Sequence, residues 1–289
     1  MNDGPCLVPA RSFAPVSGVP VGAIDTHAHV IGPRSSYPMA PVRAYDPPES
    51  AEADYTAMLA ATGMARGVIV SASVYGTDNR CTMDAVQQDP TNRRAIVVLD
   101  ADVPEDEIAR LDALGARGFR INTLFAGGTL FDALERLAAK AAPFGWHVQL
   151  LIDITMLAEV EHQLRALPID CVIDHMGHFD AARGTDWDGF RRMVGLAEDG
   201  RSHIKLSGLY RLDTEPPYER AEPIAKKLIE AVPDRLVWGS DWPHVAQYRH
   251  MPDPARLLDQ ILRLIPDPDL RRKILVETAE ALYGFPTSR

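Results

Sequence analysis

Three short segments of the sequence carry side chains of the kinds that activate water or bind metal ions. His27 and His29 are separated by one residue, so on a β-strand their side chains face the same way, with Asp25 below them. His175 and Asp241 each follow a short apolar run further along the chain. Histidine and carboxylate groups act as general bases in hydrolysis and as ligands of catalytic zinc. If the fold brings these residues together, they predict a hydrolytic or metal-binding site.

Further polar residues stand at or just after the ends of other apolar runs: Ser71, Ser73, Arg120, Asn122, Ser207 and Arg211. Each residue alone has a structural explanation, since a lone histidine is often buried and hydrogen-bonded, Asp241 can begin a helix, and Arg120 can form an ion pair. Burying so many polar groups at one end of a set of strands costs free energy unless they face a wet cavity. Their shared position therefore favours a functional site over separate structural roles.

The apolar runs that carry these residues predict eight β-strands. They occupy residues 22–30, 66–73, 93–100, 116–124, 147–153, 171–177, 203–210 and 235–241. Most are continuously apolar, which is typical of parallel strands covered on both faces. Amphipathic stretches such as residues 104–115 and 129–145 lie between them, and a last helical stretch covers residues 267–284. Thr129 and Gly145 predict the two ends of the second of these helices.

Eight strands that alternate with helices indicate an α/β fold closed into a (β/α)8 TIM-like barrel. An open doubly wound sheet is the competing arrangement, but the first strand ends HAHVIGP and lacks the glycine-rich turn GxGxxG. We expect one domain over residues 22–289, preceded by an extended arm at residues 1–21 that is rich in proline and glycine. In such a barrel the catalytic groups lie at the carboxyl ends of the strands, where the polar residues stand here.

The composition argues against several classes of protein. The 289 residues include 30 basic and 40 acidic ones, with a net charge of −10 and no basic stripe, so we expect no nucleic-acid partner. No apolar run approaches the roughly 18 residues of a membrane span, and the first twenty residues are not expected to be a signal peptide. The cysteines, Cys6, Cys81 and Cys171, are far apart and lack metal-binding spacing, which predicts reduced thiols in a cytoplasmic protein.

Six segments resemble the amidohydrolase superfamily, and within it the 2-pyrone-4,6-dicarboxylate lactonase branch: IDTHAHVIGP, ASVYGTDN, RGFRIN, GWHVQL, VIDHMG and VWGSDWPH. The resemblance implies a hydrolase that opens a lactone in the catabolism of aromatic or sugar acids. Its catalytic residues would be His27, His29, His175 and Asp241. Its substrate-binding residues would be Tyr45, Ser73, Arg120 and Arg211, to which we add Asn122 because it ends the same strand as Arg120.

The chain departs from the lactonase pattern at positions that bear on the charge of the substrate. His178 stands where the lactonase has an arginine, and residues 123–126 lack the second arginine that follows strand four. Leu151 replaces a tyrosine of strand five. Two lost guanidinium groups remove clamps for carboxylates, so we expect a lactone with a single anionic group, held by Arg120 and Arg211.

Lactone hydrolysis needs a nucleophilic water, a base and groups that stabilise the oxyanion, and the positions of these residues suggest a mechanism. Asp241 is the expected general base for water, His29 and His175 are expected to polarise the carbonyl, and His27 supports the water or the oxyanion. Tyr45 lies in a long loop, residues 31–54, which is a natural lid over the barrel mouth.

Most amidohydrolases bind one or two divalent ions through the paired histidines, further histidines or a modified lysine, and the aspartate. Strand four supplies no lysine here, and His147 stands at the beginning of strand five, which is the wrong end of the barrel. The lactonase branch is thought to act without a metal, and we therefore expect no cofactor. If one divalent ion such as zinc is bound, its expected ligands are His27, His29, His175 and Asp241.

Other functions remain open on the sequence alone. A metal-dependent decarboxylase would release CO2, and a lactone isomerase would consume no water. A non-catalytic barrel that binds a small acid is an alternative of a different class. The expected partner is a small-molecule lactone, with no membrane association, and a homo-oligomer is a further option.

Overall fold

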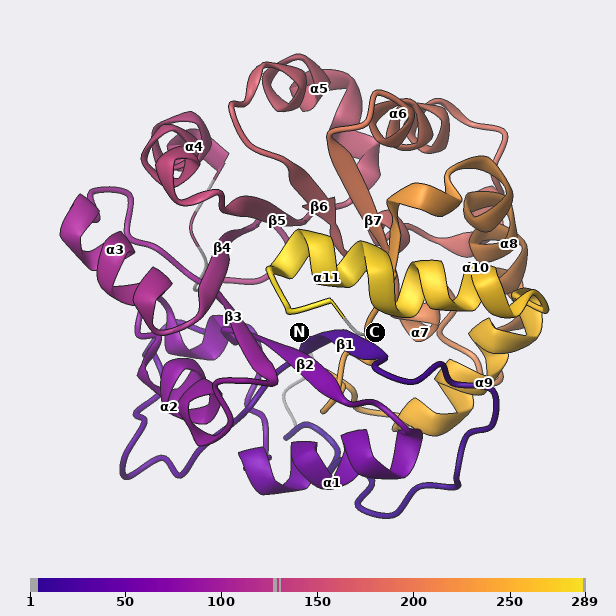
Figure 1. Cartoon of the computed structure of the whole chain (residues 1–289), viewed down its shortest axis with the longest axis horizontal. Helices are drawn as coiled ribbons and strands as arrows, with labels where there is room; N and C mark the ends of the chain where they lie inside the picture. The colour runs from indigo at the N-terminus through magenta and orange to yellow at the C-terminus, as the bar shows by residue number, and fades with distance from the viewer. Residues whose placement is uncertain (1–4, 127–128, 130, 288–289) are drawn as a thin grey trace.

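Eight parallel β-strands pair in the order of the sequence in the computed structural model, which describes residues 5–126, 129 and 131–287. They are β1 (Ile24–Ala28), β2 (Arg66–Val70), β3 (Arg93–Val97), β4 (Ala116–Asn122), β5 (His147–Leu151), β6 (Cys171–Ile173), β7 (Ser202–Leu206) and β8 (Leu236–Trp238). The backbone of Asp241 donates to His27 and that of His29 donates to Trp242, so the segment after β8 closes the ring against β1. The predicted (β/α)8 barrel is confirmed (Figure 1).

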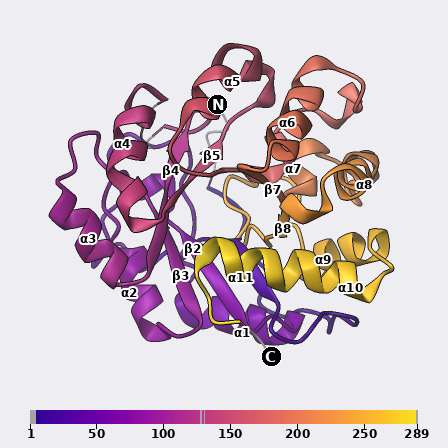
Figure 2. The ribbon, with the colours of Figure 1, turned by 45° about the horizontal axis from the view of Figure 1, so that its top comes forward.

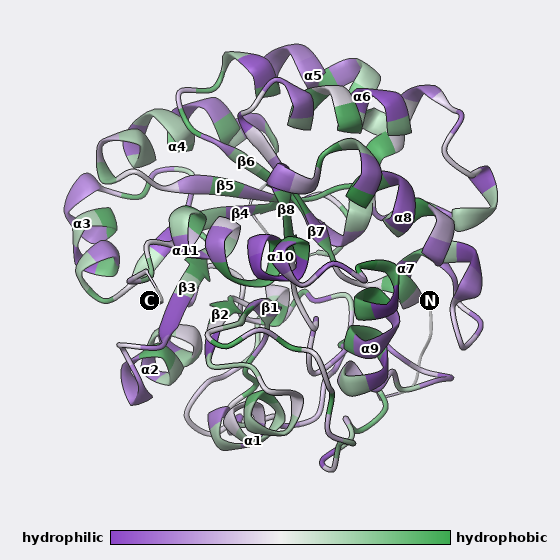
Figure 3. Cartoon of the chain, turned by 45° about the vertical axis from the view of Figure 1, so that its right-hand side comes forward, coloured by the Kyte–Doolittle hydropathy of each residue, from purple (hydrophilic) through white to green (hydrophobic). Residues whose placement is uncertain are grey.

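Helices surround the strands, and Figures 1 and 2 show this ring from two directions. They are α1 (Glu52–Thr62), α2 (Arg80–Gln88), α3 (Glu105–Ala113), α4 (Leu134–Ala141), α5 (Leu157–Ala166), α6 (Asp188–Glu198), α7 (Leu209–Leu212), α8 (Glu222–Ala231), α9 (Pro254–Leu264), α10 (Pro268–Arg272) and α11 (Thr278–Tyr283). Hydrophobic and hydrophilic residues alternate along the outer helices, as Figure 3 shows. In α9, for example, Leu258 and Ile261 are buried one turn apart, and Asp253 caps the first turn.

The helix predicted over residues 129–145 begins later than its sequence suggested. A 3₁₀ turn covers Phe131–Ala133 and α4 follows, whereas Thr129 bridges to Ile121 beside β4. The Thr129 hydroxyl donates to the carbonyl of Leu99, so it does not cap a helix. Thr129 is used as a strand partner because its carbonyl accepts from the backbone of Asn122. Leu130 lies outside the described residues, and Gly145 ends the segment in the left-handed conformation, as predicted.

The amino end of the barrel is closed by the last helical stretch. Residues 267–284 form α10, a π-helical turn at Lys273–Glu277 and α11, close to the predicted range. Tyr283 packs with Ile24 and Val237 inside the barrel, and α11 crosses this end in Figure 1. His147 lies here, with its ring 5.0 Å from that of Tyr283, at the end of the barrel that the sequence predicted. Catalytic groups must therefore gather at the opposite, carboxyl end.

The amino-terminal arm has no helix or strand in residues 5–20, and its first described part lies over the carboxyl end of the barrel. The backbone of Cys6 donates to Asp46 and that of Leu7 donates to Gln247, which links the loops after β1 and β8. Residues 1–4 of the expected arm, and residues 127, 128, 130, 288 and 289 of the expected barrel, lie outside the described residues.

The three cysteines are buried free thiols, which agrees with the expectation of reduced thiols. Among the described residues, the structure contains no helix with the length and apolar character that a membrane crossing needs.

Candidate active site

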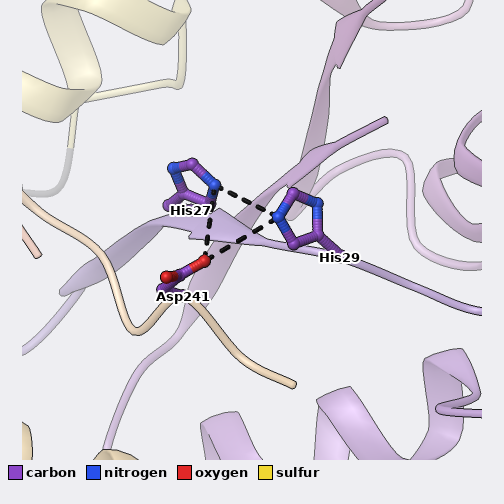
Figure 4. A group of neighbouring side chains, drawn as sticks. All are labelled: His27, His29 and Asp241. Atoms are coloured by element: carbon purple, nitrogen blue, oxygen red, sulfur yellow. Dashed lines mark hydrogen bonds and ion pairs between the residues drawn. The ribbon is translucent and has the colours of Figure 1, made fainter. Parts of the chain in front are cut away.

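His27, His29 and Asp241 meet at the carboxyl end of the barrel, as Figure 4 shows. Nε2 of His27 lies 3.4 Å from Nε2 of His29, and Oδ1 of Asp241 lies 3.7 and 3.8 Å from these two nitrogens. All three side chains are buried. The structure thus brings together the strand-one histidines and the strand-eight aspartate that the sequence singled out.

A bulge in β1 gives the two histidines their orientation. The pairing of β1 with β2 shifts between Asp25 and Ala28, so the regular alternation of side chains does not run through this strand. The carboxylate of Asp25 accepts from both the backbone and the hydroxyl of Ser240, at 2.8 and 2.6 Å, and from the hydroxyl of Tyr55 on α1. The prediction that Asp25 lies below the histidines inside the barrel is therefore wrong. Its carboxylate instead links the end of β8 to β1.

Glycine is required where β8 ends. A Cβ atom on Gly239 would lie 2.6 Å from that of His27, so only glycine allows the two strands to approach this closely. Asp241 follows two residues later with φ of 60°, a left-handed conformation that L-residues adopt at a cost. This backbone aims its carboxylate back across the barrel toward the histidines.

His175 completes the cluster from a strained segment after β6. The residues from His175 to His178 have φ values of 50°, 50°, 90° and 49°, so four consecutive residues are left-handed. The ring of His175 lies 4.7 Å from that of His27, its Nδ1 is 2.9 Å from the hydroxyl of Ser207, and its Nε2 is 3.7 Å from Oδ2 of Asp241. Strained backbone of this kind persists where the surrounding structure holds it, and it gathers at functional sites.

The two oxygens of Asp241 have different surroundings. Oδ2 accepts from the hydroxyl of Tyr210 at 2.5 Å and from Nε of Arg211 at 2.9 Å. Oδ1 has no hydrogen-bond donor among the described residues. Burial raises the pKa of Asp241, whereas the guanidinium of Arg211 lowers it, and the pKa lies well below its usual range. Asp241 is therefore a carboxylate at neutral pH, with one oxygen anchored and the other open to the cluster.

Beneath the cluster lies a second polar group, in which Arg120 joins three residues that the sequence analysis did not select: Asp174, Gln149 and Lys205. Oδ2 of Asp174 accepts from Nη2 of Arg120 and from Nε2 of Gln149, both at 3.0 Å. Nζ of Lys205 donates to Oε1 of Gln149 at 2.6 Å and to the carbonyl of Thr26 at 2.8 Å. A signal for this group was available, because a lysine and a glutamine in the middle of buried parallel strands are unusual.

The buried histidines are neutral at neutral pH. Burial, together with the ammonium group of Lys205, lowers the pKa of His27 to about 4. Burial also lowers the pKa of His29 to about 3. Lys205 itself is shifted by burial to a pKa of about 8, with Asp174 opposing the shift, so its amine stays mostly protonated.

The expected substrate-binding residues fall into two groups. Arg211 lines the cavity at the barrel mouth, and the hydroxyl of Ser73 donates to that of Tyr45 at 3.2 Å beneath the loop after β1. Arg120 is buried in its pair with Asp174, and Oδ1 of Asn122 accepts from two backbone groups of the turn after β4. The side chains of Arg120 and Asn122 thus form their hydrogen bonds and ion pairs with other groups of the protein. The lid loop is also shorter than expected, because α1 begins at Glu52.

A cavity of about 390 Å³ is separated from the cluster by Tyr210 and Arg211, and neither the clustered histidines nor Asp241 line it. Its wall includes Phe125, His178, Tyr210, Arg211, Ala246 and Arg249. Tyr210 and Arg211 are also the hydrogen-bond donors to Asp241, so a ligand in this cavity lies one side chain away from that carboxylate. His178 replaces the arginine of the lactonase pattern directly on the cavity wall, with its ring edge-on to Phe125.

Two groups of described residues have the types and spacing to hold a metal ion: His27, His29 and Asp241, and His27, Asp174 and His175. In the first group, Nδ1 of His29 lies 2.7 Å from the carbonyl of Val70, so Nδ1 carries the ring proton and Nε2 presents a lone pair. Nδ1 of His27, however, lies 3.3 Å from both the ammonium group of Lys205 and Oδ1 of Asp174, and of these two contacts only the one with Lys205 is a hydrogen bond. In this arrangement the proton of His27 is on Nε2, and the three side chains do not fit a metal ion bound by all of them.

Comparison with known proteins finds matches over nearly the whole chain. The family described as Amidohydrolase matches residues 24–285. A 2-pyrone-4,6-dicarboxylate hydrolase of Comamonas testosteroni is 33% identical over 95% of this chain and 94% of its own length. A 4-sulfomuconolactone hydrolase of Rhizobium radiobacter is 35% identical over 97% of this chain and 96% of its own length. A crystal structure from Agrobacterium tumefaciens covers 95% of this chain and all of its own, with a TM-score of 0.87 and 29% identity.

Proposed function

Because this chain belongs to the amidohydrolase family, we propose that it is a hydrolase that adds water to the ring ester of a small lactone. Two relatives that match almost its entire length are named as lactone hydrolases. The observation that carries the proposal is the open oxygen of Asp241, which faces two neutral histidines next to a cavity large enough for a small organic acid.

Asp241 is the base that takes the proton of the attacking water. Its Oδ2 is fixed by Tyr210 and Arg211, so Oδ1 is held in one direction and is free to accept. Nε2 of His29 presents a lone pair because of the hydrogen bond at Nδ1, and in the substrate complex it accepts the second hydrogen of the same water in place of its contact with Nε2 of His27. This hydrogen bond favours a water-orienting role for His29 over the carbonyl-polarising role expected from the sequence.

The acyl carbon of the lactone is attacked by this water, and the bond from that carbon to the ring oxygen breaks. The developing oxyanion accepts a hydrogen bond from Nε2 of His27, and His175 faces it from the other side of the cluster. The proton held by Asp241 returns to the departing ring oxygen, which becomes a hydroxyl group. One water is consumed and one carboxylic acid is formed.

The substrate carries one anionic group in this proposal. Arg211 lies on the cavity wall, with Nε on Asp241 and Nη2 on the carbonyl of Val245, which leaves Nη1 for a ligand. Arg120 is paired with Asp174 and is less available than the sequence implied. The other arginine on this wall, Arg249, is exposed, so a second carboxylate beside His178 and Phe125 would lose water without gaining a buried cation, at a cost of several kcal/mol.

We further propose that catalysis needs no metal ion, since the hydrogen bonds of His27 do not suit one. A panel of mono- and dicarboxylate lactones, assayed for acid release with and without a strong chelator, tests both statements. The expected result is unchanged hydrolysis of a monocarboxylate lactone in chelator. A rate that disappears with chelator and returns with zinc would contradict the metal-free proposal, and a preference for dicarboxylates would contradict the single anionic group.

A further inference from the structure

A fully buried lysine lies directly behind the histidine cluster, where the proposed reaction gives it no task. Lys205 is in the middle of β7, and its side chain is completely inaccessible to solvent. Burying an ammonium group is costly unless it is paired and hydrogen-bonded. Its ammonium group lies next to His27, a proposed catalytic histidine, which suggests that its charge acts on that ring.

The hydrogen bonds of Lys205 are directional. An ammonium group has three protons and no lone pair. Two of them point to the carbonyl of Thr26 and to Oε1 of Gln149, at 2.8 and 2.6 Å. The third is directed to Nδ1 of His27 at 3.3 Å, while Oδ1 of Asp174 lies 3.5 Å away and accepts no hydrogen bond from the described residues. His27 therefore acts as an acceptor at Nδ1.

This contact decides which ring nitrogen of His27 carries the proton. A neutral imidazole that accepts at Nδ1 has its hydrogen on Nε2. Nε2 of His27 lies 3.4 Å from Nε2 of His29, which is itself an acceptor because Nδ1 of His29 donates to Val70. Every bond in the chain from Lys205 through His27 and His29 to the carbonyl of Val70 then has one donor and one acceptor.

The opposite tautomer is what a metal site needs. A histidine bound to a metal through Nε2 ordinarily donates from Nδ1 to a carboxylate or carbonyl. Oδ1 of Asp174, which accepts no hydrogen bond from the described residues, lies 3.3 Å from Nδ1 of His27 and is the carboxylate oxygen available for such a bond. That arrangement directs the lone pairs of His27, His29 and Asp241 at one another, and a bound cation relieves their repulsion. Lys205 opposes it by holding Nδ1 as an acceptor and by adding positive charge behind the ring.

We propose that Lys205 is a positioning residue that holds His27 in the tautomer with the proton on Nε2. Because Nε2 then carries a proton, it is not available to bind a metal ion. The inference concerns the free protein and holds whichever lactone is opened. It goes beyond the proposed function because it assigns a role to a residue that touches neither the substrate nor Asp241.

Nitrogen-15 NMR of the histidine rings in the intact protein tests the proposal directly. Protonated and unprotonated ring nitrogens have well-separated resonances, and the signals of His27 are identified by their loss in His27→Gln. The expected wild-type spectrum shows His27 protonated on Nε2. In Lys205→Met the proton is expected on Nδ1, facing Asp174, while His29 remains protonated on Nδ1. A wild-type His27 protonated on Nδ1 would overturn the proposal even if Lys205→Met failed to fold.

Zinc titration supplies a second readout, without any substrate. Lys205→Met is expected to bind zinc at least tenfold more tightly than wild type, whereas Lys226→Met, which removes an exposed lysine from α8, should not differ from wild type. In the metal-free enzyme, kcat is expected to fall at least tenfold in Lys205→Met while KM changes less than threefold. Equal zinc affinity in all three proteins would overturn the proposal, and neither the spectrum nor the titration depends on lactone hydrolysis.

Discussion

The two ends of the barrel bury similar charged groups but leave them in different states. At the amino end, the guanidinium of Arg66 donates to the carbonyls of Gly22 and Pro286 and to the carboxylate of Glu280, at 2.6 to 2.9 Å. At the carboxyl end, Asp241 has two donors on one oxygen and none, among the described residues, on the other. Buried charge alone thus does not mark a site, whereas a buried charge with an unused acceptor does.

Removing the basicity of Asp241 should have the largest effect on catalysis. Asp241→Asn keeps the shape of the side chain but cannot take a proton, so we expect kcat to fall about a thousandfold, or about 4 kcal/mol in the activation free energy. Steady-state kinetics on protein of unchanged circular dichroism provides the measurement. A kcat within tenfold of wild type would remove Asp241 from the role of general base.

The corresponding change at the amino end should affect stability instead. Glu280→Gln neutralises the partner of Arg66 without changing its size, and we expect the free energy of unfolding to fall by about 1–3 kcal/mol. Urea denaturation measures the loss, and kcat of the folded protein should stay within twofold. If Glu280→Gln instead lowered kcat as Asp241→Asn does, the proposed division of the barrel into a structural and a catalytic end would fail.

Restoring an arginine on the cavity wall should change the preference for substrate charge. His178→Arg places a guanidinium where the lactonase pattern has one, and we expect kcat/KM for a dicarboxylate lactone to rise about tenfold relative to a monocarboxylate. His178 is already left-handed, so the substitution adds no new backbone strain. An unchanged ratio would show that the second carboxylate is excluded by something other than missing charge.

The pH dependence of stability offers the smallest predicted effect. His147, at the amino end, has a pKa lowered by burial to about 3, so the folded protein takes up its proton far less readily than the unfolded chain does. The unfolded state therefore binds more protons between about pH 6.5 and pH 3, and stability contributed by the neutral ring is lost as pH falls through this range.

His147→Phe should flatten this dependence, because neither ring nitrogen of His147 has a hydrogen-bond partner among the described residues. Between pH 6 and pH 5, the loss of unfolding free energy should be about 1 kcal/mol smaller in the variant, with kcat unchanged. Parallel stability curves for the two proteins would mean that His147 is protonated in the folded state.

Most of the architecture, and the residues of the cluster formed by the histidines and Asp241, could be predicted from the sequence. Eight apolar runs gave the strands because parallel strands buried on both faces have a simple signature. The helix after Thr129 was misplaced because a local capping signal was overridden by pairing with β4. Asp25 was misplaced because a bulge, which leaves no clear mark in sequence, breaks the alternation of β1.

The deeper part of the site could not be derived in the same way. Lys205 and Asp174 act through contacts between β7, β6 and β1, and these depend on the register of strands that lie far apart in the sequence. The direction of the hydrogen bond at His27 depends on where Lys205 and Asp174 lie around its ring, and the spacing of residues in the sequence does not encode this. Sequence patterns indicated which residues gather at the barrel mouth, but not which protons they carry.

The most direct test is to let the protein hydrolyse a monocarboxylate lactone in H₂¹⁸O with chelator present and to measure the mass of the product by mass spectrometry. We predict that the product acid carries one ¹⁸O atom in the new carboxylate and retains all its carbon. A product without ¹⁸O, or one that has lost CO2, would contradict the assignment of this protein as a metal-independent lactone hydrolase.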